Sequence, residues 1–131
     1  MNKGFTFIEL LVVITIIGVI FASGIVTFSA ITTKSRDTRR KADLEAMRQS
    51  LEMCRTLTGA YPDSSYVYQA DEQNSTLSCG ATGPQLMSKT PSDPKACDDG
   101  VAYTYTKLSA VTYTLAAPCM EVDTGYQVTN P

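Results

Sequence analysis

A long apolar run near the N-terminus, residues 10–31, constrains the fold of this chain more than any other feature. At a rise of 1.5 Å per residue, a helix over this run would span about 33 Å, enough to cross the hydrocarbon core of a bilayer. Many of its residues are β-branched, which would favour a strand in water. In lipid, however, every backbone N–H and C=O group must be satisfied within the segment. The run therefore predicts a transmembrane helix.

One carboxylate, Glu9, stands at the start of this run, and no other residue between Lys3 and Lys34 is charged. An acidic side chain well inside the hydrocarbon costs about 2.5–3.5 kcal/mol on insertion scales, so a simple anchor would carry an apolar residue here. A cleavable secretory signal peptide would have a shorter apolar stretch and no carboxylate. A plain signal anchor whose glutamate reaches the headgroups is an alternative that leaves the position of Glu9 unexplained.

The helical pattern continues beyond the apolar run, and no proline interrupts it. Apolar residues recur there at steps of three and four and form a single stripe. The stripe consists of Leu44, Met47, Leu51, Cys54 and Leu57 or Thr58. Gly59 is a suitable C-terminal stop, and Pro62 follows it. We expect one helix over residues 5–58, with a hydrophobic transmembrane half (5–33) and an amphipathic half (34–58).

The remaining residues, 59–131, predict a small globular head. Residues 60–100 are rich in Asp, Ser, Gly and Pro, which is typical of loops. Alternation of apolar and polar residues over 101–106 and 111–115 predicts an antiparallel hairpin near the C-terminus, to which residues 125–130 can add a third strand. A small antiparallel sheet packed against the amphipathic helix gives an α+β fold.

Composition limits the classes of function. The chain has no histidine, which excludes His-based acid–base catalysis and His metal sites. No spacing suggests a Ser–Lys pair or paired catalytic carboxylates, so we do not expect an enzyme. The net charge of −2 argues against a protein that generally coats nucleic acid.

Four cysteines all lie after the apolar run, which indicates an oxidising, extracytoplasmic compartment and up to two disulfides. No C-x-x-C pair is present, so zinc or thioredoxin-like sites are not expected. Four cysteines allow three pairings. Because Cys54 lies on the helix stripe and Cys119 follows the strand expected to pack there, we expect Cys54–Cys119 together with Cys79–Cys97.

The charges that flank the apolar run conflict with export of the head. Lys3 precedes the run, whereas a basic stretch, residues 34–41, follows it. Applied alone, the positive-inside rule would keep that second flank in the cytoplasm. The cysteines favour the opposite orientation, and we follow the cysteines.

The segment KGFTFIELLVVITIIGVI resembles the N-terminus of type IV pilins and of the related pseudopilins. The resemblance rests on Lys3, Gly4, the aromatic Phe5 and a glutamate, Glu9, five positions into the mature chain. The stretch SRDTRRKADLEAMRQSLEMC, followed by TGAYP, is also similar to these proteins. The resemblance implies a pilin-like layout and a leader peptide, residues 1–4. A prepilin peptidase would cut this leader off between Gly4 and Phe5 and then methylate the new Phe5 amine.

The same resemblance implies a role for the lone carboxylate. Glu9 of an incoming subunit would pair with the Phe5 ammonium of a subunit already in a filament, and a buried pair of this kind sets register. Many pilins carry a proline near position 26, where the filament helix partly unwinds. This chain has Val26, so Gly18 and Gly24 are the candidates for local melting, and close helix packing is an equal alternative for both.

The implied function is structural: a pilin that polymerises through its N-terminal helix into a type IV pilus-like surface filament, of the kind used in cell adhesion and twitching motility. A pseudopilin of a type II protein secretion system is the alternative, and a membrane-anchored extracytoplasmic binding module is a third interpretation. The implied partners are further copies of the chain, the prepilin peptidase, the inner-membrane assembly platform with its ATPase, and the membrane, but no specific nucleic acid. The chain would cross the cytoplasmic membrane once, with its N-terminus inside, before it enters an extracellular or periplasmic filament.

Two features stay open. Major pseudopilins have a calcium-stabilised loop, for which Asp93, Asp98 and Asp99 are weak candidates. Turn-forming aspartates are the plainer interpretation, and no other cofactor is expected. The basic stretch, residues 34–41, is either a solvated face with partners such as Asp37–Lys41, or a contact between filament subunits, or, least favoured, a DNA-binding surface.

Overall fold

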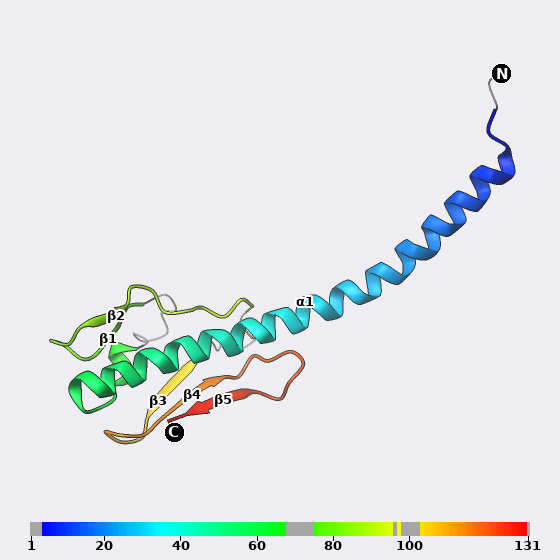
Figure 1. The fold of residues 1–131 in the computed structure, drawn as a ribbon. Coiled ribbons are helices and arrows are strands. Elements are labelled where there is room, and N and C mark those ends of the chain that lie inside the picture. Colours follow the sequence, from blue (N-terminus) through cyan, green and yellow to red (C-terminus); the bar gives the residue numbers. More distant parts are fainter. Residues whose placement is uncertain (1–3, 68–74, 96, 98–102, 131) are drawn as a thin grey trace. The chain divides into compact units, whose positions relative to one another are not determined.

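The computed structural model describes residues 4–67, 75–95, 97 and 103–130, without the side chains of 25–27. The chain forms two compact units, Met1–Lys34 and Ser35–Pro131, and the second unit, which combines the predicted head with the amphipathic half of the long helix, is here called the head. One helix, α1, runs from Phe7 to Thr58 through both units, and the remaining elements belong to the second (Figure 1). The predicted α+β class, a long N-terminal helix followed by small antiparallel sheets, is confirmed.

Helix α1 ends where the sequence predicts. The residue after it, Gly59, has a φ of +83°, a left-handed conformation that side chains disfavour. Its N–H donates to the carbonyl oxygen of Arg55 at 2.8 Å, which satisfies one of the carbonyls that a helix end leaves free.

A three-stranded antiparallel sheet, ordered β3-β4-β5, packs on the C-terminal half of α1 (Figure 1). Its strands are β3 (Thr104–Lys107), β4 (Tyr113–Ala117) and β5 (Tyr126–Thr129). Tyr105 pairs with Leu115, and Leu115 pairs with Val128, so one buried row crosses all three strands. The predicted hairpin and its third strand are confirmed, except that the expected start of the hairpin at 101–102 lies outside the described residues.

The segment expected to be mostly loop contains a second, two-stranded sheet. A short 3₁₀ helix, η1 (Ser64–Tyr66), is followed by β1 (Leu77–Ser78) and β2 (Gln85–Met87), which pair antiparallel. Strands of two and three residues are too short to show a period-2 pattern, so no alternation in the sequence predicts them. The turn between them is closed by the N–H of Cys79, which donates to the carbonyl oxygen of Pro84 at 3.1 Å.

The core of the second unit contains the predicted helix stripe. Leu44, Met47, Leu51 and Cys54 are fully buried. Their neighbours in the core are Tyr61, Val67, Leu77, Tyr103, Tyr105, Tyr113, Leu115, Ala117 and Val128. The expected extension to Leu57 or Thr58 is wrong, because both are exposed. The chain turns back at Gly59, and Tyr61 fills the next position of the core instead.

The predicted disulfide pairing is also wrong. Cys54 is bonded to Cys79, with Cα atoms 5.2 Å apart, and Cys97 to Cys119, with Cα atoms 5.3 Å apart, whereas Cys54–Cys119 and Cys79–Cys97 were expected. The reason is the direction of β4 along the helix. Before β4, the carbonyl oxygen of Ala110 accepts the N–H of Tyr61, near the end of α1.

After β4 the chain runs back along the helix, and the N–H of Glu121 donates to Asp37. Asp37 and Cys54 are 17 residues apart in the sequence, which corresponds to about 25 Å along a helix. Cys119 therefore lies too far along α1 to reach Cys54. Cys79, on the β1–β2 hairpin, takes that place.

Two core tyrosines differ in whether their buried hydroxyl group has a hydrogen-bond partner, so together they test what such a bond contributes to stability. The Tyr113 hydroxyl is buried and has no hydrogen-bond partner among the described residues, whereas the Tyr105 hydroxyl donates to the carbonyl oxygen of Pro62 at 2.8 Å. We expect Tyr113→Phe to leave the free energy of unfolding unchanged or to raise it by up to about 1 kcal/mol. Tyr105→Phe should lower it by about 1 kcal/mol. Denaturant unfolding of the disulfide-intact protein measures both, and equal losses in the two variants would contradict the prediction.

Candidate functional site

The first candidate site is the peptide bond between Gly4 and Phe5. Both residues precede α1 and are exposed, and the Phe5 side chain is 83% exposed. A Cβ built on Gly4 meets nothing within 4 Å among the described residues. The described part of the chain therefore does not itself require a glycine at this position. A requirement for glycine here would have to come from a molecule that approaches the backbone closely.

The lone carboxylate of the apolar segment has a partner within its own chain. Thr6 is the residue before α1, and its backbone N–H and hydroxyl both donate to Oε2 of Glu9, at 2.8 and 2.6 Å. In return, the Glu9 N–H donates to the Thr6 hydroxyl oxygen at 3.4 Å. This reciprocal arrangement is a capping box, which satisfies backbone donors that a helix start leaves free.

The sequence reasoning missed this role, although its signal, Thr-x-x-Glu directly before an apolar run, is visible at Thr6 and Glu9. The capping box does not test the predicted pair between Glu9 and Phe5. In the uncut chain the nitrogen of Phe5 is a peptide nitrogen, so it carries no charge. Pairing with a freed amine stays a prediction.

The apolar half of α1 is long and apolar enough to cross a membrane, and none of its most apolar window is buried inside the chain. Large side chains with high exposure include Phe7, Val19, Ile20, Phe21, Phe28 and Ile31. Hydroxyl groups within this segment bond to the helix itself. Thr15 donates to the carbonyl oxygen of Val12, and Ser23 donates to that of Ile20, at 2.8 and 2.9 Å. Such back-bonding satisfies polar side chains where lipid offers no partner.

The two glycines predicted as melting points both lie within the unbroken helix. Neither Gly18 nor Gly24 has an atom within 4 Å of an added Cβ, so packing within the described part of the chain does not require a glycine at either position. Both interpretations, local melting and close helix packing, stay predictions.

Residues 1–25 match the family model of the prokaryotic N-terminal methylation motif. The chain carries the N-terminal signal of type IV pilins and pseudopilins. No curated protein and no solved structure gives a match to the chain. The methylation motif covers Gly4, Phe5 and Glu9 but ends before the head. It therefore says nothing about the function of the head.

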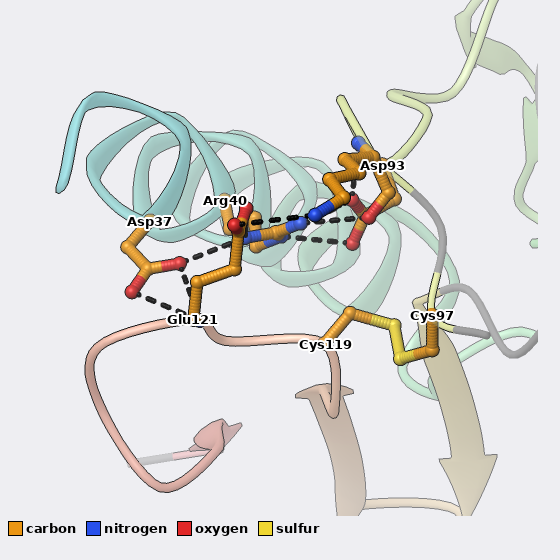
Figure 2. The surroundings of a disulfide bond; sticks show 7 residues. Asp37, Arg40, Asp93, Cys97, Cys119 and Glu121 are labelled. Atoms are coloured by element: carbon orange, nitrogen blue, oxygen red, sulfur yellow. Dashed lines mark hydrogen bonds and ion pairs between the residues drawn. A yellow bond between two sulfur atoms is a disulfide. The ribbon is translucent and has the colours of Figure 1, made fainter. Parts of the chain in front are cut away.

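The second candidate site is a group of charges in the head around the buried Arg40, here called the Arg40 cluster: Asp37, Arg40, Asp93 and the partly exposed Glu121 (Figure 2). The guanidinium group of Arg40 is fully buried. Its Nη2 donates to Asp93 Oδ1 at 2.8 Å and to the carbonyl oxygen of Lys95 at 2.8 Å, and its Nη1 donates to Asp37 Oδ1 at 2.7 Å. Glu121 Oε1 lies 3.4 Å from Nη1. Hydrogen bonds from Arg40 to Asp93 are the main reason why the pKa of Arg40 is raised.

The Arg40 cluster and its neighbours account for much of the basic stretch, residues 34–41. Arg36 binds both carboxylate oxygens of Glu121, and Lys41 pairs with Asp123 at 2.6 Å. The suggested Asp37–Lys41 partnership is wrong, because Asp37 pairs with Arg40 instead. Arg36, Arg40 and Lys41 therefore connect α1 to the segment after β4 through ion pairs. A basic face that contacted only water would make no such connection.

Two carboxylates of the Arg40 cluster, Glu121 and Asp37, have pKa values below their ordinary ones. Hydrogen bonds from Arg36 are the main reason why the pKa of Glu121 falls from its ordinary value of 4.5 to about 2. Burial alone would raise the pKa of Asp37. Hydrogen bonds from the backbone N–H groups of Glu121 and Val122 and from Arg40 outweigh burial and hold it below 3.8.

These shifts predict an acid dependence of head stability. A carboxyl group whose pKa is lower in the folded state stabilises that state above its unfolded pKa. The contribution of Glu121 should be complete above pH 4.5 and should disappear as the pH falls toward about 2. We expect the melting temperature of the head to fall across this window, and Glu121→Gln to flatten the fall. Thermal unfolding at a series of pH values tests this, and identical profiles for the two proteins would contradict it.

The calcium prediction is only partly covered by the structure. Asp93 accepts hydrogen bonds from Arg40 and from the N–H of Lys95, so its oxygens already have donors. Asp98 and Asp99 lie outside the described residues. Calcium binding in this loop stays a prediction.

Proposed function

We propose that the chain is the precursor of a structural filament subunit that polymerises through the apolar half of α1. The observation that carries this proposal is the methylation motif over residues 1–25, which includes the start of α1, a helix whose apolar side chains in this half are exposed in the described part of the chain. A membrane can cover such a helix before assembly, and the same segments of other copies can cover it afterwards. The head, with its own core, would remain outside this assembly.

The processing site supports the same proposal. The bond between Gly4 and Phe5 lies in exposed, non-helical chain directly before the Thr6–Glu9 capping box. A peptidase can therefore reach this peptide bond without first unwinding a helix. Cleavage would leave Phe5 with a free amine that becomes charged, is methylated, and is available to the Glu9 carboxylate of a neighbouring subunit.

We place the N-terminus in the cytoplasm and the head outside the membrane. Two disulfides in the head support an oxidising compartment. The basic flank argues the other way under the positive-inside rule, and we give the disulfides more weight. Two disulfides in so small a head also suit an exposed pilus that must persist outside the cell, which is why we favour a pilus over a secretion pseudopilus.

Gly4→Val tests the processing step. We expect the variant to accumulate as uncut precursor in the membrane and to form no filaments, because a branched side chain beside the scissile bond would obstruct the peptidase cleft. The matched control is Gly18→Val, the same substitution where an added Cβ also meets nothing within 4 Å. The control should be cut normally. Mass spectrometry of the N-terminus, with imaging of sheared filaments, measures both, and a normally cut Gly4→Val chain would contradict the proposal.

A deletion of the gene in the source organism separates the pilus from its alternative. Loss of surface fibres, with normal release of exported enzymes, would support the pilus. Exported enzymes retained behind the envelope would instead identify a secretion pseudopilin. Normal fibres together with normal secretion would leave the membrane-anchored binding module.

A further inference from the structure

The Arg40 cluster joins the two chain segments that carry Cys97 and Cys119 (Figure 2). On one side, Arg40 binds Asp93, four residues before Cys97, and the carbonyl oxygen of Lys95, two residues before it. On the other side it binds Glu121, two residues after Cys119. One side chain of α1 thus contacts the flanks of both cysteines.

A second residue of α1 fixes the Cys119 flank. The carboxylate of Asp37 accepts the N–H of Glu121 at 3.0 Å and the N–H of Val122 at 2.8 Å, and it is itself held by Arg40. Because these are backbone donors, they fix the path of the chain after Cys119 and not only one side chain. The Cys97 flank is fixed in the same way, since Arg40 binds the Lys95 backbone oxygen and Asp93 accepts the Lys95 N–H.

The charged side chains at the centre of these contacts, Arg40, Asp37 and Asp93, are buried. The side chains of Arg40 and Asp93 are both fully inaccessible to solvent, so separating the two flanks would leave a buried charge without its partner. None of these contacts involves a sulfur atom. They can therefore hold the two flanks together while both cysteines are still thiols.

We infer that Arg40 is a positioning residue for the oxidation of Cys97 and Cys119, and that it selects this pairing among the three that four cysteines allow. A thiolate of one cysteine attacks the disulfide of an oxidant, here oxidised glutathione or an extracytoplasmic thiol–disulfide oxidoreductase, and forms a mixed disulfide. The second thiolate displaces the oxidant, so two protein thiols become one disulfide and the oxidant's disulfide becomes two thiols. Because Arg40 binds the chain beside both cysteines, it keeps the Cys97 and Cys119 thiols close together and raises their effective concentration relative to each other.

This role of Arg40 is independent of filament assembly. The other disulfide, Cys54–Cys79, serves as an internal control for it. Cys54 and Cys79 join α1 to the β1–β2 hairpin, and the described contacts of the Arg40 cluster do not include either of them. Loss of Arg40 should therefore affect the two disulfides unequally. By linkage, the disulfide must strengthen the cluster by the same factor by which the cluster favours the disulfide.

The test uses the full chain in detergent, equilibrated in buffers of reduced and oxidised glutathione, then trapped by alkylation and analysed by mass spectrometry. In Arg40→Gln we expect the equilibrium constant for forming Cys97–Cys119 to fall by about 5- to 150-fold, the usual range of coupling between sites. The constant for Cys54–Cys79 should change by less than about threefold, and mispaired disulfides should appear on rapid oxidation. Asp63→Asn, which breaks the distant Lys107–Asp63 pair, is the matched control and should change neither constant.

Asp93→Asn is the second variant, for the case that Arg40→Gln does not fold. It removes only the charge of Asp93 and leaves Arg40 bound to Asp37. We expect a smaller but still selective loss at Cys97–Cys119. Equal losses at both disulfides in Asp93→Asn, or no loss at Cys97–Cys119 in either variant, would overturn the inference.

Discussion

Replacing Arg40 by glutamine is expected to lower the free energy of unfolding of the head by about 3–5 kcal/mol, the usual cost of removing one partner of a buried ion pair. The guanidinium group is fully buried and binds three carboxylates and one backbone oxygen. Glutamine can replace at most a small part of these bonds. Asp93, whose side chain is also fully buried, would then remain as a charge without its cation. A domain of this size has little stability to spare, so the loss should be visible as a large fall in melting temperature.

Arg36→Gln is the matched control for this prediction. Arg36 also binds Glu121, but its side chain is partly exposed, so water can replace the lost contact. We expect a much smaller loss than for Arg40→Gln. Denaturant unfolding with both disulfides intact measures the two variants. Similar losses would show that the burial of Arg40 does not matter.

The parts of the fold that could be predicted from the sequence are those with a repeating pattern. The stripe Leu44, Met47, Leu51 and Cys54 has helical spacing, and all four residues are buried as expected. Alternation of apolar and polar residues likewise marked the hairpin strands β3 and β4. These patterns are visible because burial of one face imposes a period on the sequence.

The parts that were missed depend on contacts between distant segments. The β1–β2 sheet consists of two very short strands, and the disulfide pairing depends on which end of β4 lies beside Cys54. Arg40 was expected to lie on an exposed basic surface. It is buried because Asp93 and Glu121, more than fifty residues away in the chain, are brought to it by folding. No local pattern around Arg40 reveals those partners.

Of the candidate site, the methylation signal could be predicted, because it is a local motif, whereas the processing bond between Gly4 and Phe5 that it implies stays a prediction. The capping box is local too, and its signal, Thr6-x-x-Glu9, is visible in the sequence. As a result, Glu9 now has two possible roles, capping its own helix and pairing with a neighbouring subunit's amine. The two roles require different chemistry, since a capping box accepts glutamine in place of glutamate and an ion pair does not.

Glu9→Gln should therefore give subunits that are cut and methylated normally but assemble poorly. Glutamine can still accept the Thr6 N–H, so the helix start is kept. It carries no charge, so the ammonium group of Phe5 in a neighbouring subunit would lose its counter-ion in a low-dielectric environment. Loss of a charge-assisted contact changes an association constant by about tenfold or more, and every added subunit would be affected. The yield of sheared filaments per processed subunit measures the effect.

Thr6→Val is the matched variant that separates the two roles. Valine has nearly the same shape, but it lacks the hydroxyl that donates to Glu9 and accepts the Glu9 N–H, while the Glu9 charge remains. If pairing with a neighbour is the essential role, Thr6→Val assembles nearly normally and Glu9→Gln does not. If capping is the essential role, the order is reversed, because glutamine preserves the cap and valine weakens it. Normal filaments from Glu9→Gln would exclude the charge pair. The reason for a carboxylate at this point of the apolar segment would then have to be sought in the helix start alone.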